Sequence, residues 1–127
     1  MAATRHKVAS AWPSNRRAPA VYSPPMVNDA PRFDAAQAAQ IAHQIFRMDV
    51  TAEALPSERD QNFLLTTAAG HRHVLKIANA GERRAMLDAQ VAALAHVAAR
   101  TPFCPRPIPT GDGESIAITR GEDGREH

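Results

Sequence analysis

Apolar residues recur every three or four positions from residue 38 onward, which is the spacing of one face of an α-helix. The set is Ala38, Ile41, Ala42, Ile45 and Phe46. Asp34 and Gln37, just before this stretch, have the spacing of a capping box. Asp34 takes the N-cap position. The pattern predicts a helix over residues 34–48.

A different pattern follows, in which short apolar runs alternate with polar residues. Residues 63–67 and 73–78 are predicted to be strands joined through a turn at residues 68–71, and residues 50–56 form a further short strand. Alternation places Val74, Lys76 and Ala78 on one face of the second run. A lysine between Val and Ala needs an anionic partner if that face is covered. A solvated lysine on a sheet edge is the alternative, and the pattern leaves both open.

Helical spacing returns over residues 81–100, before Thr101 and Pro102 end the helix. The apolar stripe consists of Leu87, Val91, Leu94, Val97 and Ala98. Gln90 falls inside this stripe, and a buried side-chain amide must find hydrogen bonds. Lys76, on the strand directly before this helix, is a candidate partner. Periodicity alone equally allows Gln90 to lie at the solvent-exposed border of the stripe.

The last part of the chain is divided by prolines and glycines. Three prolines at 105, 107 and 109 predict an extended edge or linker segment, because central strands exclude proline. Turns are predicted at residues 111–113 and 121–124, with a strand over residues 115–119 between them. The chain stops just past the second turn with no closing element, so we expect it to be truncated. The predicted fold is α+β, with an antiparallel sheet of about five strands and two helices.

Composition narrows the classes of protein. A length of 127 residues favours one domain, and 44% hydrophobic residues suffice for a modest core. No apolar run approaches the roughly 18–20 residues of a membrane span, so we expect no membrane partner. The single cysteine, Cys104, cannot form an internal disulfide, which fits a reducing compartment. We therefore expect a cytoplasmic protein.

The basic pI of 9.2 comes from the N-terminal segment. Residues 1–28 carry four Lys or Arg and no acid, whereas residues 29–127 carry eleven Lys or Arg against thirteen Asp or Glu. A folded nucleic-acid binder needs a basic patch of its own, so we expect no nucleic-acid partner for the folded part. Residues 1–32, rich in proline, are predicted to be a disordered basic extension, and the domain to span residues 33–127. A start codon assigned too early and a transit peptide are the alternatives for the extension.

The candidate chemistry lies around Lys76. The preceding loop, residues 57–62, is polar and lacks the glycines of a Walker loop. It can still curl over a nucleotide and offer Ser57, Asn62 and backbone N–H groups, or it is an ordinary hairpin connection. His71 and His73 lack a third ligand at suitable spacing, so no metal site is predicted.

Four segments together resemble a known family. They are S-E-R-D-Q-N-F, V-L-K-I-A-N-A, L-D-A-Q-V-A-A-L and P-R-P-I-P-T-G-D-G, which occur in this order between residues 57 and 113. Residues 31–127 resemble the N-terminal lobe of the aminoglycoside-phosphotransferase and choline-kinase-like superfamily. They are most similar to the hydroxylysine-kinase-like phosphotransferases, including those fused to a class III aminotransferase. The resemblance implies a protein-kinase-like N-lobe.

The resemblance also implies roles for individual residues. The loop of residues 57–62 would cover the phosphates of ATP or GTP, and Lys76 would hold the α- and β-phosphates. Gln90 stands where most members have a helix glutamate that pairs with this lysine. A neutral amide can orient Lys76 by hydrogen bonding but supplies no charge pairing. The implied nucleotide-binding residues are Ser57, Arg59, Asp60, Asn62, Lys76 and Gln90.

The implied activity is transfer of the γ-phosphoryl group to a hydroxyl of a small, amine-bearing acceptor. This reaction also needs a positioned hydroxyl and acids that bind Mg²⁺, which the family supplies from a C-terminal lobe. No H-x-D sequence occurs in the chain, so we expect no catalytic residues here and no kinase turnover from these 127 residues alone. The alternative is a non-catalytic binding or interaction module, or a gene remnant. Nucleic-acid binding through residues 1–28 is a third reading.

Overall fold

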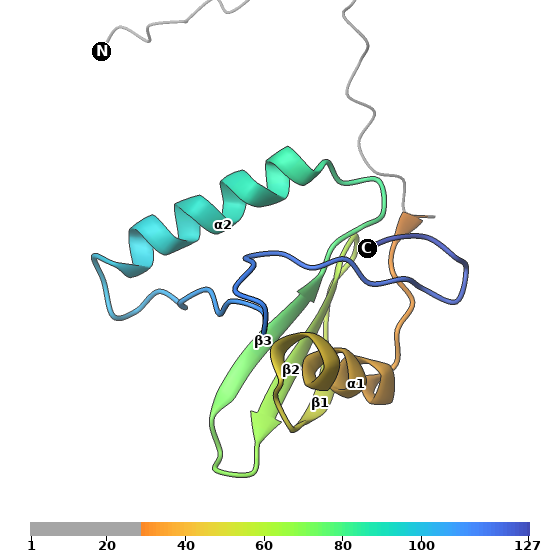
Figure 1. The fold of residues 1–127 in the computed structure, drawn as a ribbon, viewed down its shortest axis with the longest axis horizontal. Helices are drawn as coiled ribbons and strands as arrows, with labels where there is room; N and C mark the ends of the chain where they lie inside the picture. Colours follow the sequence, from red (N-terminus) through yellow and green to blue (C-terminus); the bar gives the residue numbers. More distant parts are fainter. Residues whose placement is uncertain (1–28) are drawn as a thin grey trace, which may run out of the picture.

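The computed structural model describes residues 29–127. Residues 1–28 of the predicted extension lie outside the described part. The order of elements is helix, three strands and helix (Figure 1): α1 (Ala35–Phe46), β1 (Val50–Leu55), β2 (Gln61–Thr67), β3 (Arg72–Ile77) and α2 (Arg84–Ala98). The strands form one antiparallel sheet in the order β1-β2-β3. The α+β class is therefore confirmed, and each of these five elements begins and ends within three residues of its predicted bounds.

The prediction of about five strands is wrong, because the described residues hold a sheet of only three. Residues 115–119 do not form the predicted strand. The backbone of Thr119 instead exchanges hydrogen bonds with that of His127, at 2.9 and 2.8 Å, and a single bridge joins Arg120 to Glu126. The backbone of this segment therefore pairs within residues 119–127 rather than with the sheet.

Helix α1 covers one face of the sheet and forms the core with it. It packs on β1 and β2, and the buried cluster consists of Ala38, Ile41, Ala42, Phe63, Leu65, Leu75 and Ile77. Phe63, in the middle strand, is only 1% exposed. Because strand residues alternate between faces, Leu64, Val74 and Lys76 lie on the opposite face. Val74 is 63% exposed, so this second face is open.

The ends of α1 are tied down by specific contacts. The predicted capping box is present: the Asp34 carboxylate accepts from the Gln37 backbone N–H at 2.8 Å, and the Gln37 side chain accepts from the Asp34 N–H at 2.8 Å. The helix ends two residues earlier than predicted because Arg47 adopts a left-handed conformation, with φ 58°. The Gly111 N–H then donates to the Ile45 carbonyl at 2.8 Å, which satisfies an otherwise unpaired carbonyl of the last turn.

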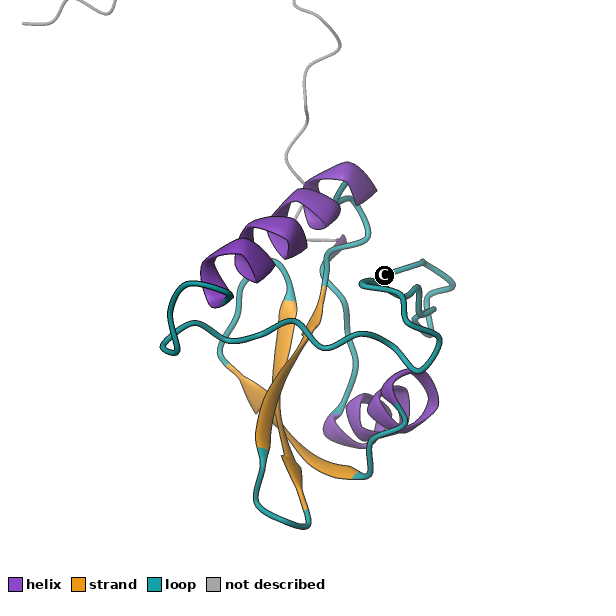
Figure 2. Ribbon diagram, turned by 60° about the vertical axis from the view of Figure 1, so that its left-hand side comes forward, coloured by secondary structure: helices purple, strands orange, loops and turns teal. Residues whose placement is uncertain are grey.

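Helix α2 stands apart from the sheet, whereas α1 lies against it (Figures 1 and 2). Of the predicted apolar stripe only Ala98 is buried, and Val97 is 46% exposed. The stripe therefore covers much less of the sheet than its periodicity indicates. The helix starts at Arg84 rather than residue 81 because the preceding residues form a turn, in which the Glu82 N–H donates to the Asn79 carbonyl at 2.9 Å.

The two ends of the described chain meet beside the connection from β3 to α2 (Figure 1). The Ala80 N–H donates to the Asp29 carbonyl at 3.1 Å, and the Asp29 carboxylate pairs with Arg125. The His127 ring contacts the Ala78 carbonyl at 3.0 Å and packs edge-on against Phe33. The start of the described chain, within the predicted extension, thus contacts the domain.

No helix among the described residues has the length and apolar character to cross a membrane.

Candidate functional site

Lys76 is the centre of a small polar site at the edge of the open face. Its Nζ lies 3.1 Å from Oδ2 of Asp60, in the loop before β2. The same Nζ donates to Oε1 of Gln90, on α2, at 3.2 Å. The side chain remains 45% exposed. The lysine ammonium is therefore held from two directions, while nearly half of the side chain still faces solvent.

The strand register places two further predicted features beside Lys76. Asn62 on β2 is directly opposite Lys76 on β3, and Leu64 is directly opposite Val74. Such cross-strand neighbours have Cβ atoms roughly 4.5–5.5 Å apart on the same face. The open face thus presents a cation and an amide at one end and an apolar pair next to them. This combination suits a ligand with both an anionic and a flat apolar part.

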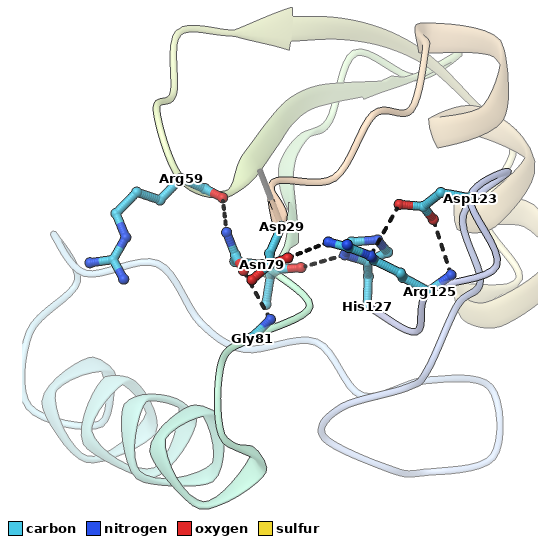
Figure 3. A network of polar contacts seen from close by, with 8 residues as sticks. Asp29, Arg59, Asn79, Gly81, Asp123, Arg125 and His127 are labelled. Atoms are coloured by element: carbon cyan, nitrogen blue, oxygen red, sulfur yellow. Dashed lines mark hydrogen bonds and ion pairs between the residues drawn. The ribbon is translucent and has the colours of Figure 1, made fainter. Parts of the chain in front are cut away.

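The loop of residues 57–60 is fastened to the connection between β3 and α2 by Asn79 (Figure 3). Asn79 is only 3% exposed. Its Nδ2 donates to the Arg59 carbonyl at 3.1 Å, and its Oδ1 accepts from the Gly81 N–H at 2.9 Å. The Asn79 backbone N–H donates to Oδ1 of Asp60 at 2.9 Å. Both the loop and the connection are thereby held next to Lys76.

Sequence reasoning missed Asn79. The available signal was its position two residues before Gly81 at a helix entrance, because Asn side chains often accept from the backbone two residues on. The Asn79 side chain adds to the Asp60–Lys76 contact in holding the loop beside Lys76.

The predicted site residues are only partly brought together. Asp60, Asn62 and Gln90 lie around Lys76, although Gln90 is exposed rather than buried in the α2 stripe. Ser57 lies exposed in the loop, and no contact places it near the lysine. Arg59 contributes its carbonyl oxygen to Asn79, while its guanidinium extends away from the contacts in Figure 3. Their predicted roles as nucleotide contacts remain predictions.

A separate cavity of about 240 Å³ lies between the β3–α2 connection, the start of α2 and the C-terminal segment. Its lining includes Asn79, Glu82, Arg84, Leu87, Ile118 and His127, but not Lys76. Pockets for drug-sized ligands measure roughly 300–1,000 Å³, so this cavity is small for a nucleotide. The lysine site is an open surface rather than this cavity, and the two share only Asn79.

Within residues 29–127 no group of three or more His, Cys, Asp or Glu side chains lies close enough together to hold a metal ion. Comparison with protein-family models, with curated proteins and with solved structures gave no match.

Proposed function

We propose that residues 29–127 form the nucleotide-binding lobe of a phosphotransferase that acts on a hydroxyl of a small, amine-bearing molecule. The observation that carries the proposal is the position of Lys76. Its ammonium group is held by Gln90 at 3.2 Å, on the open face of the sheet and directly opposite Asn62. An oriented ammonium group on a half-exposed side chain is suited to binding the phosphates of ATP or GTP.

Each part of the open face has a task in this proposal. Lys76 attracts and orients the phosphates, and Asn62 offers an amide N–H group from the opposite strand. Val74 and Leu64 provide the apolar surface on which a base can lie. The loop of residues 57–60, fastened by Asn79, borders the phosphates and offers the Ser57 hydroxyl and backbone N–H groups.

The chain's own residues orient the nucleotide but do not complete the reaction. Phosphoryl transfer needs Mg²⁺ to neutralise charge on the phosphates and a carboxylate to position the attacking hydroxyl. The described residues offer no cluster of metal ligands, so Mg²⁺ would arrive with the nucleotide. The acids and the acceptor site would come from a second lobe, on this chain or another.

Nucleotide titration tests the proposal, with ATP and Mg²⁺ added to the chain and to two variants. Lys76→Ala removes a charge-assisted contact, so we expect a loss of affinity of about tenfold or more. The chain contains only one other lysine, Lys7, and Lys7→Ala is the matched control for loss of one positive charge. Equal affinity of both variants and the unmodified chain, or no binding at all, would contradict the proposal.

A second candidate, a non-catalytic interaction module, is favoured by the exposed apolar side chains. Phe103 is 94% exposed, and Val74 and Ile118 are each 63% exposed. Apolar surface left exposed by the described residues often marks a contact with another protein. Light scattering across a range of protein concentrations checks this reading. Self-association that Phe103→Ser abolishes, with no nucleotide binding, would favour it over the nucleotide-binding lobe.

A further inference from the structure

The charge of Lys76 is balanced by a residue of the loop and not by a residue of the helix. Asp60 approaches Nζ at 3.1 Å through Oδ2, while the contact from α2 is the neutral oxygen of Gln90 at 3.2 Å. The Asp60 side chain is 26% exposed, so its pairing with the lysine is partly shielded from water. Lys76 therefore has one charged and one neutral acceptor, which come from different parts of the fold.

Other acids lie on the same loop, on α2 and on β1, and none of them forms an ion pair with Lys76 among the described residues. Glu58, in the loop, is exposed. On α2, Asp88 pairs with Arg84 at 3.1 Å, one turn apart on the same helix. Glu53 is on β1, and the middle strand separates β1 from β3. Among the ion pairs of the described residues, the Lys76 ammonium pairs with Asp60 alone.

Asp60 also connects Lys76 to the backbone of the β3–α2 connection. Its second oxygen, Oδ1, accepts from the Asn79 N–H at 2.9 Å. One carboxylate thus bridges the lysine side chain and the main chain that leads into α2. Since the backbone hydrogen bond fixes the carboxylate, the carboxylate can fix the direction of the ammonium group.

From this geometry we infer that Asp60 is a positioning residue, which supplies the negative charge that holds the Lys76 ammonium toward the open face. This inference rests on the proposed function, in which Lys76 binds phosphates, and gives Asp60 a role different from direct nucleotide contact. Because Asp60 and Gln90 contact the same nitrogen, the negative charge should be transferable from one to the other.

The test measures the acylation rate of Lys76 by acetic anhydride in the whole chain without nucleotide, read by mass spectrometry of the peptides obtained after quenching and digestion. Lys7, the only other lysine, serves as the reference amine in the same molecule. Acylation requires the nitrogen to leave its contacts with Asp60 and Gln90 and reach the reagent. Asp60→Asn keeps an oxygen for the Asn79 N–H and removes only the charge. We expect it to speed acylation of Lys76, relative to Lys7, about two- to fivefold, the effect expected of a half-exposed ion pair.

The double variant Asp60→Asn/Gln90→Glu moves the carboxylate to the helix. We expect it to return the relative rate to that of the unmodified chain, which loss of packing or of the loop's position would not do. Gln90→Glu alone adds a second carboxylate and should slow acylation further, so the inference stays testable if Asp60→Asn fails to fold. An unchanged rate in Asp60→Asn, or no rescue by the double variant, would overturn the inference.

A second acylation measurement, made with nucleotide present, distinguishes failure of this inference from failure of the proposed function. Acylation of the unmodified chain is repeated with ATP and Mg²⁺. Charge-dependent rates together with protection of Lys76 by ATP support both the inference and the nucleotide site. Charge-dependent rates without protection support the role of Asp60 and contradict the nucleotide site.

Discussion

The two faces of the same three-stranded sheet are built in different ways. The face against α1 is held by apolar burial, with Phe63, Leu65, Leu75 and Ile77 each at most 7% exposed. The opposite face carries Asn62, Leu64, Val74 and Lys76 and is held by a few polar contacts with the loop and α2. Adjacent residues of one strand, such as Leu75 and Lys76, thus belong to different environments.

The difference indicates how stability and binding are divided in this domain. Burying apolar surface is the main favourable contribution to folding, and nearly all of it lies on the α1 side. Half-exposed ion pairs contribute little to stability, but they can fix the direction of a side chain. We therefore expect substitutions on the covered face to unfold the protein, and those on the open face to change binding.

The largest expected effect concerns the covered face. Phe63→Ala removes a side chain that is 1% exposed and should lower the free energy of unfolding by about 3–5 kcal/mol. Val74→Ala, on the open face and 63% exposed, should change it by no more than about 0.5 kcal/mol. Urea denaturation of both variants measures the difference. Similar losses in the two variants would mean that the open face is covered in solution.

A smaller effect is expected where the open face meets the connection to α2. Asn79→Ala leaves the Gly81 N–H and the Arg59 carbonyl without their partner, at a cost of about 1–3 kcal/mol. Hydrogen exchange of the amides of residues 58–60 should become faster because the loop loses its attachment. Asn62→Ala is the matched control, since Asn62 lies half-buried on β2 away from these bonds. Unchanged exchange in Asn79→Ala would show that the loop is held by other contacts.

The contact between α1 and the second half of the chain provides a third comparison. A Cβ added at Gly111 would lie 2.8 Å from Cγ of Arg47, so Gly111→Ala should cost about 1–2 kcal/mol through crowding. Arg47→Ala removes the crowding atoms, and the cost of Gly111→Ala should shrink in that background. A double-mutant cycle by thermal denaturation measures this coupling. If the losses of stability in the two single variants simply add in the double variant, Gly111 and Arg47 do not interact, and the prediction is wrong.

The smallest effect on stability is expected at Lys76 itself. Lys76→Met keeps most of the apolar stem and removes the charge, and because the side chain is 45% exposed the free energy of unfolding should change by less than about 1 kcal/mol. Binding of ATP should fall sharply in the same variant. A loss of stability as large as that of Phe63→Ala would assign Lys76 a structural role instead.

The covered half of the molecule could be predicted from the sequence because local patterns determine it. The Asp34–Gln37 capping box, the α1 stripe and the alternation around Leu75 all depend on neighbours within a few residues. The contact between Lys76 and Gln90 was also expected, and it is present at 3.2 Å. Its role in binding a nucleotide remains a prediction.

The rest depends on contacts between distant residues, which local patterns do not encode. Residues 115–119 have the composition of a strand, but the Thr119 backbone pairs with His127 and not with the sheet. The α2 stripe predicts burial, yet little of the sheet lies beneath it. The contact of the Asp60 carboxylate with Lys76 was not foreseen, and the predicted contact of Asp60 with a nucleotide stays a prediction. In each case the position of a remote segment decides the outcome.

The central claim is that the open face around Lys76 binds a nucleotide. Amide chemical shifts of the ¹⁵N-labelled chain during titration with ATP and Mg²⁺ test it most directly, because they report on both faces at once. We predict saturable shifts at Asp60, Asn62, Val74 and Lys76, with little change at Ala38 and Ile41 on α1. The absence of saturable shifts, or shifts confined to residues away from the open face, would contradict the account.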